Sequence, residues 1–143
     1  MKLKISHIIL ITIACLSLSS CVRNNNLVPY VPVDLYINLY LPSYSNLNAI
    51  GGWAYVSGGS KGIIIYRQTA DVFSAYDRHC THNADNPCGS VDVDSTSTFV
   101  ECTCDGSQFQ LYDGLVINGP AAFSLKPYRT SYSLTSNVVH IYN

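Results

Sequence analysis

The feature that most limits the fold is a series of short apolar runs separated by turn residues, with no convincing amphipathic helix. Residues 34–42, DLYINLYLP, alternate apolar and polar side chains, which predicts a half-buried strand. Further strands are expected in WAYVS, GIIIYRQ, VFSAYD, FVECTC and QFQLY, and a closing hairpin in SYSLTSNVVHIYN. The Gly-rich turn GGSKG joins the first two of these strands. About seven to nine short strands predict an all-β sandwich or small barrel.

Residues 1–20 have the layout of a secretory signal: two lysines, an apolar run and then small residues. The run is too short to predict a membrane span. The segment LSSC, residues 18–21, matches the lipobox of bacterial lipoproteins. In such proteins the cysteine receives lipid and becomes the new N-terminus, so Cys21 is the predicted lipidation site. An ordinary cleaved signal or a simple membrane anchor is the alternative.

Three parts of the chain follow from this reading. Residues 1–20 are the predicted lipoprotein signal peptide, residues 21–33 an Asn- and Pro-containing tether, and residues 34–143 one domain. Loss of the two signal lysines takes the formal charge from −1 to −3, and sparse basic residues argue against nucleic acid as a partner. We expect a monomer in the cell envelope, lipid-anchored and exposed to the periplasm or the cell surface, where disulfides form.

Four of the six cysteines lie close together in the sequence with a histidine and an acidic residue. Cys80 and His82 form one C-x-H pair, and Cys102 and Cys104 form a C-x-C pair followed by Asp105. Each pair follows a predicted strand, so two loops can meet around one ion or cluster. Thiolate and imidazole are ligands of zinc and of iron–sulfur centres. With Cys88, the four cysteines can instead form two disulfides in three different pairings.

The two pairs and their flanks resemble a known family. CTH and CTCDGSQF are similar to the two boxes of the Rieske [2Fe-2S] domain, and GLVINGPAAFSLKPY resembles its third loop. The resemblance extends over roughly residues 52–142, nearly the whole mature domain. It implies a Rieske-like sandwich or small barrel, with a cluster-binding subdomain formed by two loops and covered by the third.

The resemblance also implies roles for individual residues. Cys80 and Cys102 would ligate one iron and His82 the other. Asp105 stands where the family has its second histidine, and its carboxylate is a possible, though harder, iron ligand. A disulfide is implied between Cys88 and Cys104. Gly106 and Ser107 would donate hydrogen bonds near a sulfide or a cysteine sulfur.

The expected function is that of a membrane-anchored Rieske-type iron–sulfur protein, a single-electron carrier with a [2Fe-2S] cluster and a periplasmic redox partner. The alternative is a Rieske-like lipoprotein without a cluster, stabilised by disulfides and acting as a binding or structural component. Zinc on the same four groups is a third reading. A self-contained enzyme is the weakest, because Rieske-type oxygenases need a second iron domain for which this chain has no room.

Four other polar residues, three before the first box and one in the last strand, are predicted to have no ligand role. His79 should point away from Cys80, because adjacent side chains at a strand end face opposite sides. Asp77 and Arg78 are expected to be surface charges at the end of a strand. His140 is expected on the surface of the last strand, without a function.

Overall fold

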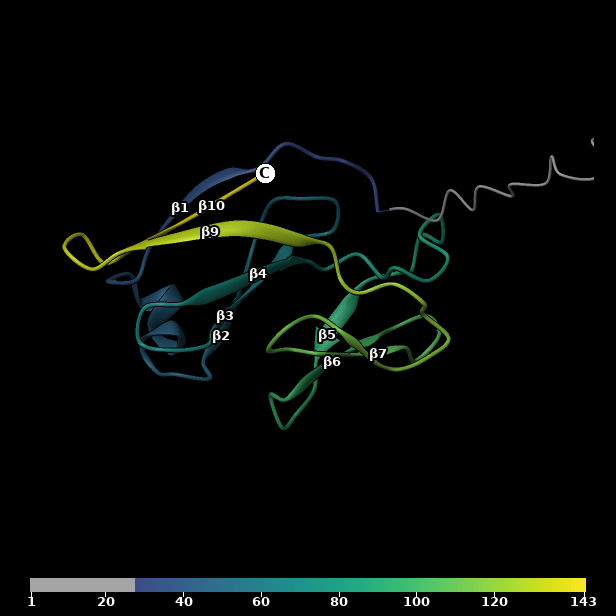
Figure 1. Cartoon of the computed structure of the whole chain (residues 1–143). Helices are drawn as coiled ribbons and strands as arrows, with labels where there is room; N and C mark the ends of the chain where they lie inside the picture. The colour runs from purple at the N-terminus through teal and green to yellow at the C-terminus, as the bar shows by residue number, and fades with distance from the viewer. Residues whose placement is uncertain (1–27) are drawn as a thin grey trace, which may run out of the picture.

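The computed structural model describes residues 28–143 (Figure 1). The predicted signal peptide and Cys21 lie outside the described residues, and the predictions made for them stay predictions. Within residues 28–143, none of the helices has the length and apolar character needed to cross a membrane.

A six-stranded antiparallel sheet curls into a half-barrel and forms the larger part of the fold (Figure 1). Its strand order is β1-β10-β9-β4-β3-β2. The strands are β1 (Asp34–Asn38), β2 (Trp53–Val56), β3 (Ile63–Arg67), β4 (Phe73–Asp77), β9 (Pro127–Ser133) and β10 (Val138–Tyr142). The all-β prediction is therefore confirmed, and the predicted closing hairpin is β9 with β10.

A smaller four-stranded sheet lies beside the large one and forms a separate subdomain (Figure 1). Its order is β5-β6-β7-β8, with β5 at Val91–Val93, β6 at Phe99–Cys102, β7 at Gln108–Gln110 and β8 at Val116–Asn118. In the chain, this subdomain falls between β4 and β9. Because those two strands pair with each other, both ends of the subdomain are fixed to the large sheet.

Strand β3 is buried on both of its faces and connects the two hydrophobic cores. Ile63 and Ile65 face the core of the large sheet, whereas Ile64 faces the core of the subdomain, and all three side chains are fully buried. An uninterrupted apolar run is typical of a strand covered on both sides. The segment GIIIYRQ therefore positions the subdomain against the sheet.

Three local features differ from the sequence prediction. The first strand ends at Asn38 rather than continuing to residue 42, and a 3₁₀ helix, η1 (Pro42–Asn48), which was not expected, follows it. A proline suits this helix start, where no amide hydrogen is required. Strands β5 and β8 were not expected, since each has only three residues and each includes a polar one.

The last residues of the predicted tether follow the surface of the fold. The Asn143 side chain donates to the Val31 carbonyl over 2.8 Å and accepts from the Val33 amide over 3.1 Å. Lys126 Nζ donates to the Pro29 carbonyl over 2.8 Å. Residues 29–33 are thus held by Lys126, just before β9, and by Asn143, just after β10.

Candidate metal centre

Two buried cysteines face each other where the large sheet meets the subdomain. Cys80 lies three residues beyond β4, and its amide donates to the Gly89 carbonyl over 2.9 Å. Cys102 is the last residue of β6, and its amide donates to the Ser107 carbonyl over 2.8 Å. Their exposed fractions are 0% and 1%. The two backbone hydrogen bonds therefore fix the chain at both cysteines, whose side chains are buried.

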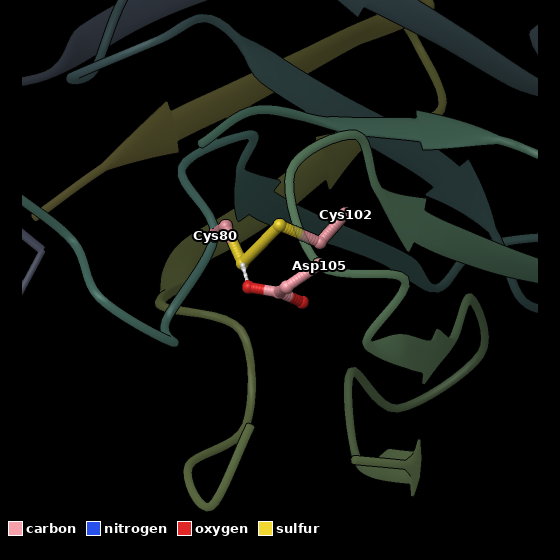
Figure 2. A group of neighbouring side chains, drawn as sticks. All are labelled: Cys80, Cys102 and Asp105. Carbon is pink, nitrogen blue, oxygen red and sulfur yellow. Dashed lines mark hydrogen bonds between the residues drawn. A yellow bond between two sulfur atoms is a disulfide. The ribbon is translucent and has the colours of Figure 1, made fainter. Parts of the chain in front are cut away.

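Asp105 completes a compact group of three possible metal ligands. The sulfurs of Cys80 and Cys102 and a carboxylate oxygen of Asp105 all lie within 4.8 Å of one another (Figure 2). Asp105 Oδ2 is 3.6 Å from the Cys80 sulfur, and Oδ1 accepts the Ser107 amide hydrogen over 2.8 Å. The carboxylate is therefore held in a defined orientation toward the sulfurs.

In this structure the two buried cysteines are joined as a disulfide, with a Cα–Cα distance of 5.7 Å (Figure 2). His82, the fourth predicted ligand, is half-buried in the same loop as Cys80. Its ring nitrogens do not belong to the group that lies within 4.8 Å. Of the four predicted ligands, the structure thus brings three together and leaves His82 outside that group.

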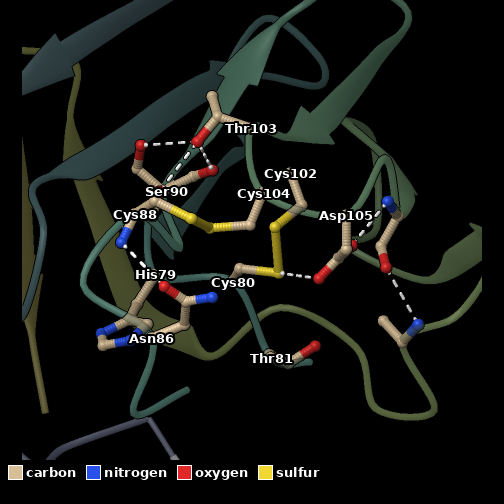
Figure 3. The surroundings of a disulfide bond; sticks show 12 residues. His79, Cys80, Thr81, Asn86, Cys88, Ser90, Cys102, Thr103, Cys104 and Asp105 are labelled. Atoms are coloured by element: carbon tan, nitrogen blue, oxygen red, sulfur yellow. Dashed lines mark hydrogen bonds between the residues drawn. A yellow bond between two sulfur atoms is a disulfide. The ribbon is translucent and has the colours of Figure 1, made fainter. Parts of the chain in front are cut away.

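A second disulfide joins Cys88 to Cys104, the pair that the resemblance assigns to a bridge, with a Cα–Cα distance of 5.7 Å. Cys88 is exposed and Cys104 is half-buried. The Thr103 hydroxyl donates to the Cys88 carbonyl over 2.8 Å (Figure 3). The hydroxyl and the disulfide together hold the loop after His82 against the turn after β6.

The third loop is hydrogen-bonded to both boxes. Thr81 Oγ1 donates to the Phe123 carbonyl over 2.5 Å, and the Ala121 amide donates to Ser107 Oγ over 2.9 Å. Thr81 and Ser107 are buried. The two loops and their cover therefore form one connected unit rather than three independent turns.

Asp77 was predicted to be a surface charge, and that prediction is wrong. Its side chain is fully buried and accepts hydrogen bonds from the Ser60 amide (2.7 Å), the His79 amide (2.9 Å) and the Tyr128 hydroxyl (2.7 Å). Several donors thus satisfy the hydrogen-bonding capacity of this buried carboxylate. Burial, the hydrogen bond to Asp77 and the charge of Asp77 together raise the pKa of Tyr128.

His79 points away from the sulfur group, in agreement with the sequence prediction, and its ring is buried. Nε2 lies 2.6 Å from the Ala84 carbonyl, and Nδ1 lies 2.8 Å from Ser60 Oγ. A carbonyl only accepts, so Nε2 carries the hydrogen. Both ring nitrogens are therefore engaged in fixing the loop that carries Cys80 and His82. Sequence reasoning missed this network because Ser60 and Tyr128 come from distant segments.

The donor set suits a [2Fe-2S] cluster when the disulfide between Cys80 and Cys102 is reduced. A cysteine sulfur ligates iron as a thiolate, so Cys80 and Cys102 can serve as ligands only when they are not bonded to each other. With that bond open, two sulfurs and a carboxylate already converge on one small volume. An imidazole is available two residues after Cys80. Sulfur, nitrogen and oxygen donors of these kinds all ligate iron.

Comparisons with known proteins agree with the fold and the two boxes. The sequence description of the Rieske [2Fe-2S] domain family matches residues 46–129. No curated protein sequence is significantly similar to the chain. Among solved structures, the plasma membrane Rieske protein PetC3 of Synechocystis PCC 6803 aligns with a TM-score of 0.56 and 22% identity, covering 78% of this chain and 99% of that chain.

The ferredoxin of carbazole 1,9a-dioxygenase from Nocardioides aromaticivorans IC177 also aligns, with a TM-score of 0.49 and 13% identity, over 79% of this chain and 98% of that one. The fold and the paired loops define a β-domain of the iron–sulfur type. Because the family match covers more than half of the sequence, the chain belongs to the Rieske [2Fe-2S] domain family.

Proposed function

We propose that this chain is a membrane-anchored Rieske-type iron–sulfur protein that carries single electrons in the cell envelope. The observation that carries the proposal is the convergence of Cys80, Cys102 and Asp105 at the meeting point of the two box loops. Family membership supports the same conclusion. Lipid on Cys21 would hold the domain at the membrane, and stable attachment needs two or more acyl chains.

Each residue of the site has a role that its position supports. Cys80 and Cys102 would hold one iron, and His82 and Asp105 the other. A bound [2Fe-2S] cluster supplies a one-electron redox couple. The Ser107 amide keeps Asp105 oriented, and the buried walls around Cys80 and Cys102 exclude water. A periplasmic redox partner is expected at the third loop, where Phe123 is exposed beside Thr81.

A second candidate function is favoured by one specific observation, the disulfide between Cys80 and Cys102. In that form, neither sulfur can ligate a metal, and the chain would be a Rieske-like lipoprotein that acts as a binding or structural component. Each of the two disulfides would then stabilise the fold by about 2–4 kcal/mol. The two candidates differ in iron content, which can be measured.

The test is reconstitution of the purified chain with iron and sulfide after reduction by a dithiol. We expect a reddish-brown protein whose reduced form gives an electron paramagnetic resonance signal of the Rieske type. His82→Ala should lose iron, whereas His140→Ala, which removes a histidine of β10 that contacts Asp34 and lies outside the site, should retain it. A colourless protein with two disulfides and no iron after the same treatment supports the second candidate and rejects the first.

A further inference from the structure

The two disulfides of the site differ sharply in access to solvent. Cys80 and Cys102 have exposed fractions of 0% and 1%, whereas Cys88 is exposed and Cys104 is half-buried. An external thiolate must reach a sulfur to attack it, so the Cys88 sulfur is the accessible target and the buried pair is shielded. Reduction of the buried pair from outside therefore needs a route.

The geometry of the turn after β6 offers that route. Cys104 packs against the core cluster that contains both Cys80 and Cys102, and only Thr103 separates it from Cys102 in the chain. Figure 3 shows the two disulfides next to each other, with Cys102 and Cys104 on adjoining backbone. A thiolate released at Cys104 would thus be adjacent to the buried disulfide without any large movement of the chain.

We propose that Cys88–Cys104 is a thiol–disulfide exchange site, through which an external dithiol of the cell envelope reduces the buried Cys80–Cys102 pair. The inference goes beyond the proposed function, and it holds for the metal-free chain. Its consequence for the site is that exchange converts two sulfurs bonded to each other into two sulfurs able to ligate a metal.

The exchange balances in four transfers. One thiolate of the donor attacks the Cys88 sulfur, and Cys104 leaves as a thiolate. Cys104 attacks the Cys102 sulfur, and Cys80 leaves and takes up a proton. The second thiol of the donor attacks the other donor sulfur, which is bonded to Cys88. This step closes the donor disulfide and releases Cys88 as a thiolate. Cys88 attacks the Cys104 sulfur, which restores the Cys88–Cys104 bond and releases Cys102, and Cys102 takes up a proton. In total, two electrons and two protons have moved from the donor to the chain.

Asp105 offers a hydrogen-bond acceptor to the Cys80 thiol once the exchange has released it. Its Oδ2 lies 3.6 Å from the Cys80 sulfur, which is within the range of a hydrogen bond from a thiol. A Cys80 thiol would therefore have an acceptor as soon as the Cys80–Cys102 bond opens. Cys102 has no comparable carboxylate contact among the hydrogen bonds of residues 28–143.

The experiment uses the full-length, metal-free, oxidised chain under native conditions. One equivalent of dithiothreitol is added, samples are alkylated at intervals, and each cysteine is read by peptide mass mapping. Thiols should appear at Cys80 and Cys102. In the double variant Cys88→Ser with Cys104→Ser, reduction of Cys80–Cys102 should be at least about tenfold slower, because access governs thiolate attack. In denaturant the two proteins should react at equal rates.

A second measurement needs no variant. Wild-type samples quenched with acid early in the reaction should contain a Cys102–Cys104 disulfide as a transient species. The proposal is overturned if the double variant is reduced as fast as the wild type under native conditions, or if Cys88 and Cys104 become thiols while Cys80–Cys102 stays bonded. Free thiols at Cys80 and Cys102 in the oxidised chain would also overturn it. Because no iron is added, none of these results depends on whether a cluster binds.

Discussion

Asp105 places a carboxylate beside the Cys80 sulfur, at the position where the sequence pattern of the family has an imidazole. A negative charge near an iron pair disfavours the reduced state, because reduction adds another electron. At 4 Å and an effective dielectric constant of about 20, the repulsion between that charge and the added electron is about 4 kcal/mol. Asp105 should therefore lower the midpoint potential of a bound cluster and weaken its retention.

The substitution Asp105→His tests this effect. We expect higher iron occupancy and a midpoint potential higher by on the order of 100 mV, as follows from the same Coulomb estimate. Protein-film voltammetry and iron analysis measure both quantities. Asp85→His, at an exposed carboxylate of the first loop, is the matched control and should change neither. If Asp105→His behaves like Asp85→His, Asp105 is not a ligand.

Tyr128 is one of the donors to the buried Asp77. Tyr128→Phe should reduce the free energy of unfolding by about 1.5–3 kcal/mol, the usual range for a hydrogen bond to a charged group. Chemical denaturation measures this loss, and Tyr36→Phe, at an exposed tyrosine of β1, should show almost none. An equal effect of the two substitutions would contradict the role of Tyr128.

Because the pKa of Tyr128 is raised in the folded chain, the decrease in the free energy of unfolding caused by Tyr128→Phe depends on pH. The stability that this hydroxyl contributes is complete below its ordinary pKa of 10.0 and declines as the pH rises above that value, because the unfolded chain then loses the proton first. The difference in the free energy of unfolding between wild type and Tyr128→Phe should therefore be constant around neutral pH. It should become smaller above about pH 10.

At the scale of single elements, β3 is the strand that connects the sheet to the subdomain. Ile64→Ala and Ile65→Ala should each cost about 2–5 kcal/mol, because both remove a fully buried side chain. Amide hydrogen exchange should distinguish the two variants. Ile64→Ala should speed exchange of amides in β5 to β8, whereas Ile65→Ala should speed exchange in β1 and β10. Identical patterns would show that the two cores are not distinct.

The sequence predicted the longer strands because their side chains alternate or are continuously apolar, as in β3 and β10. It did not predict β5 and β8, whose pairing depends on neighbouring strands rather than on their own three residues. It placed Asp77 on the surface because its donors lie 17 and 51 residues away in the chain. The resemblance predicted that Cys80, Cys102 and Asp105 meet and that Cys88 bonds to Cys104, but it did not predict a bond between Cys80 and Cys102.

At the scale of the whole molecule, the proposed attachment to the membrane rests on Cys21 as the lipidation site. Cys21→Ala should abolish incorporation of labelled fatty acid and release the domain from the membrane fraction. Cys15→Ala, at the other cysteine of the predicted signal, is the matched control and should leave both unchanged. Fractionation and labelling measure the two effects. Continued labelling of the Cys21→Ala chain would contradict the lipobox prediction.

The fold places the two boxes and the third loop on the side of the subdomain (Figure 1). The start of the described chain lies against the third loop, where Lys126 Nζ donates to the Pro29 carbonyl. Contacts to the covering loop come from both boxes, through Thr81 and Ser107. The site is therefore held by two separate segments of the chain, and its geometry depends on the whole domain rather than on one loop.

The most direct test is a crystal structure of the chain after reduction and reconstitution, with diffraction data collected at the iron absorption edge. The account predicts two neighbouring anomalous peaks between the box loops, bonded to Cys80, His82, Cys102 and Asp105. Absence of any iron peak, together with continuous density between the sulfurs of Cys80 and Cys102, would contradict it.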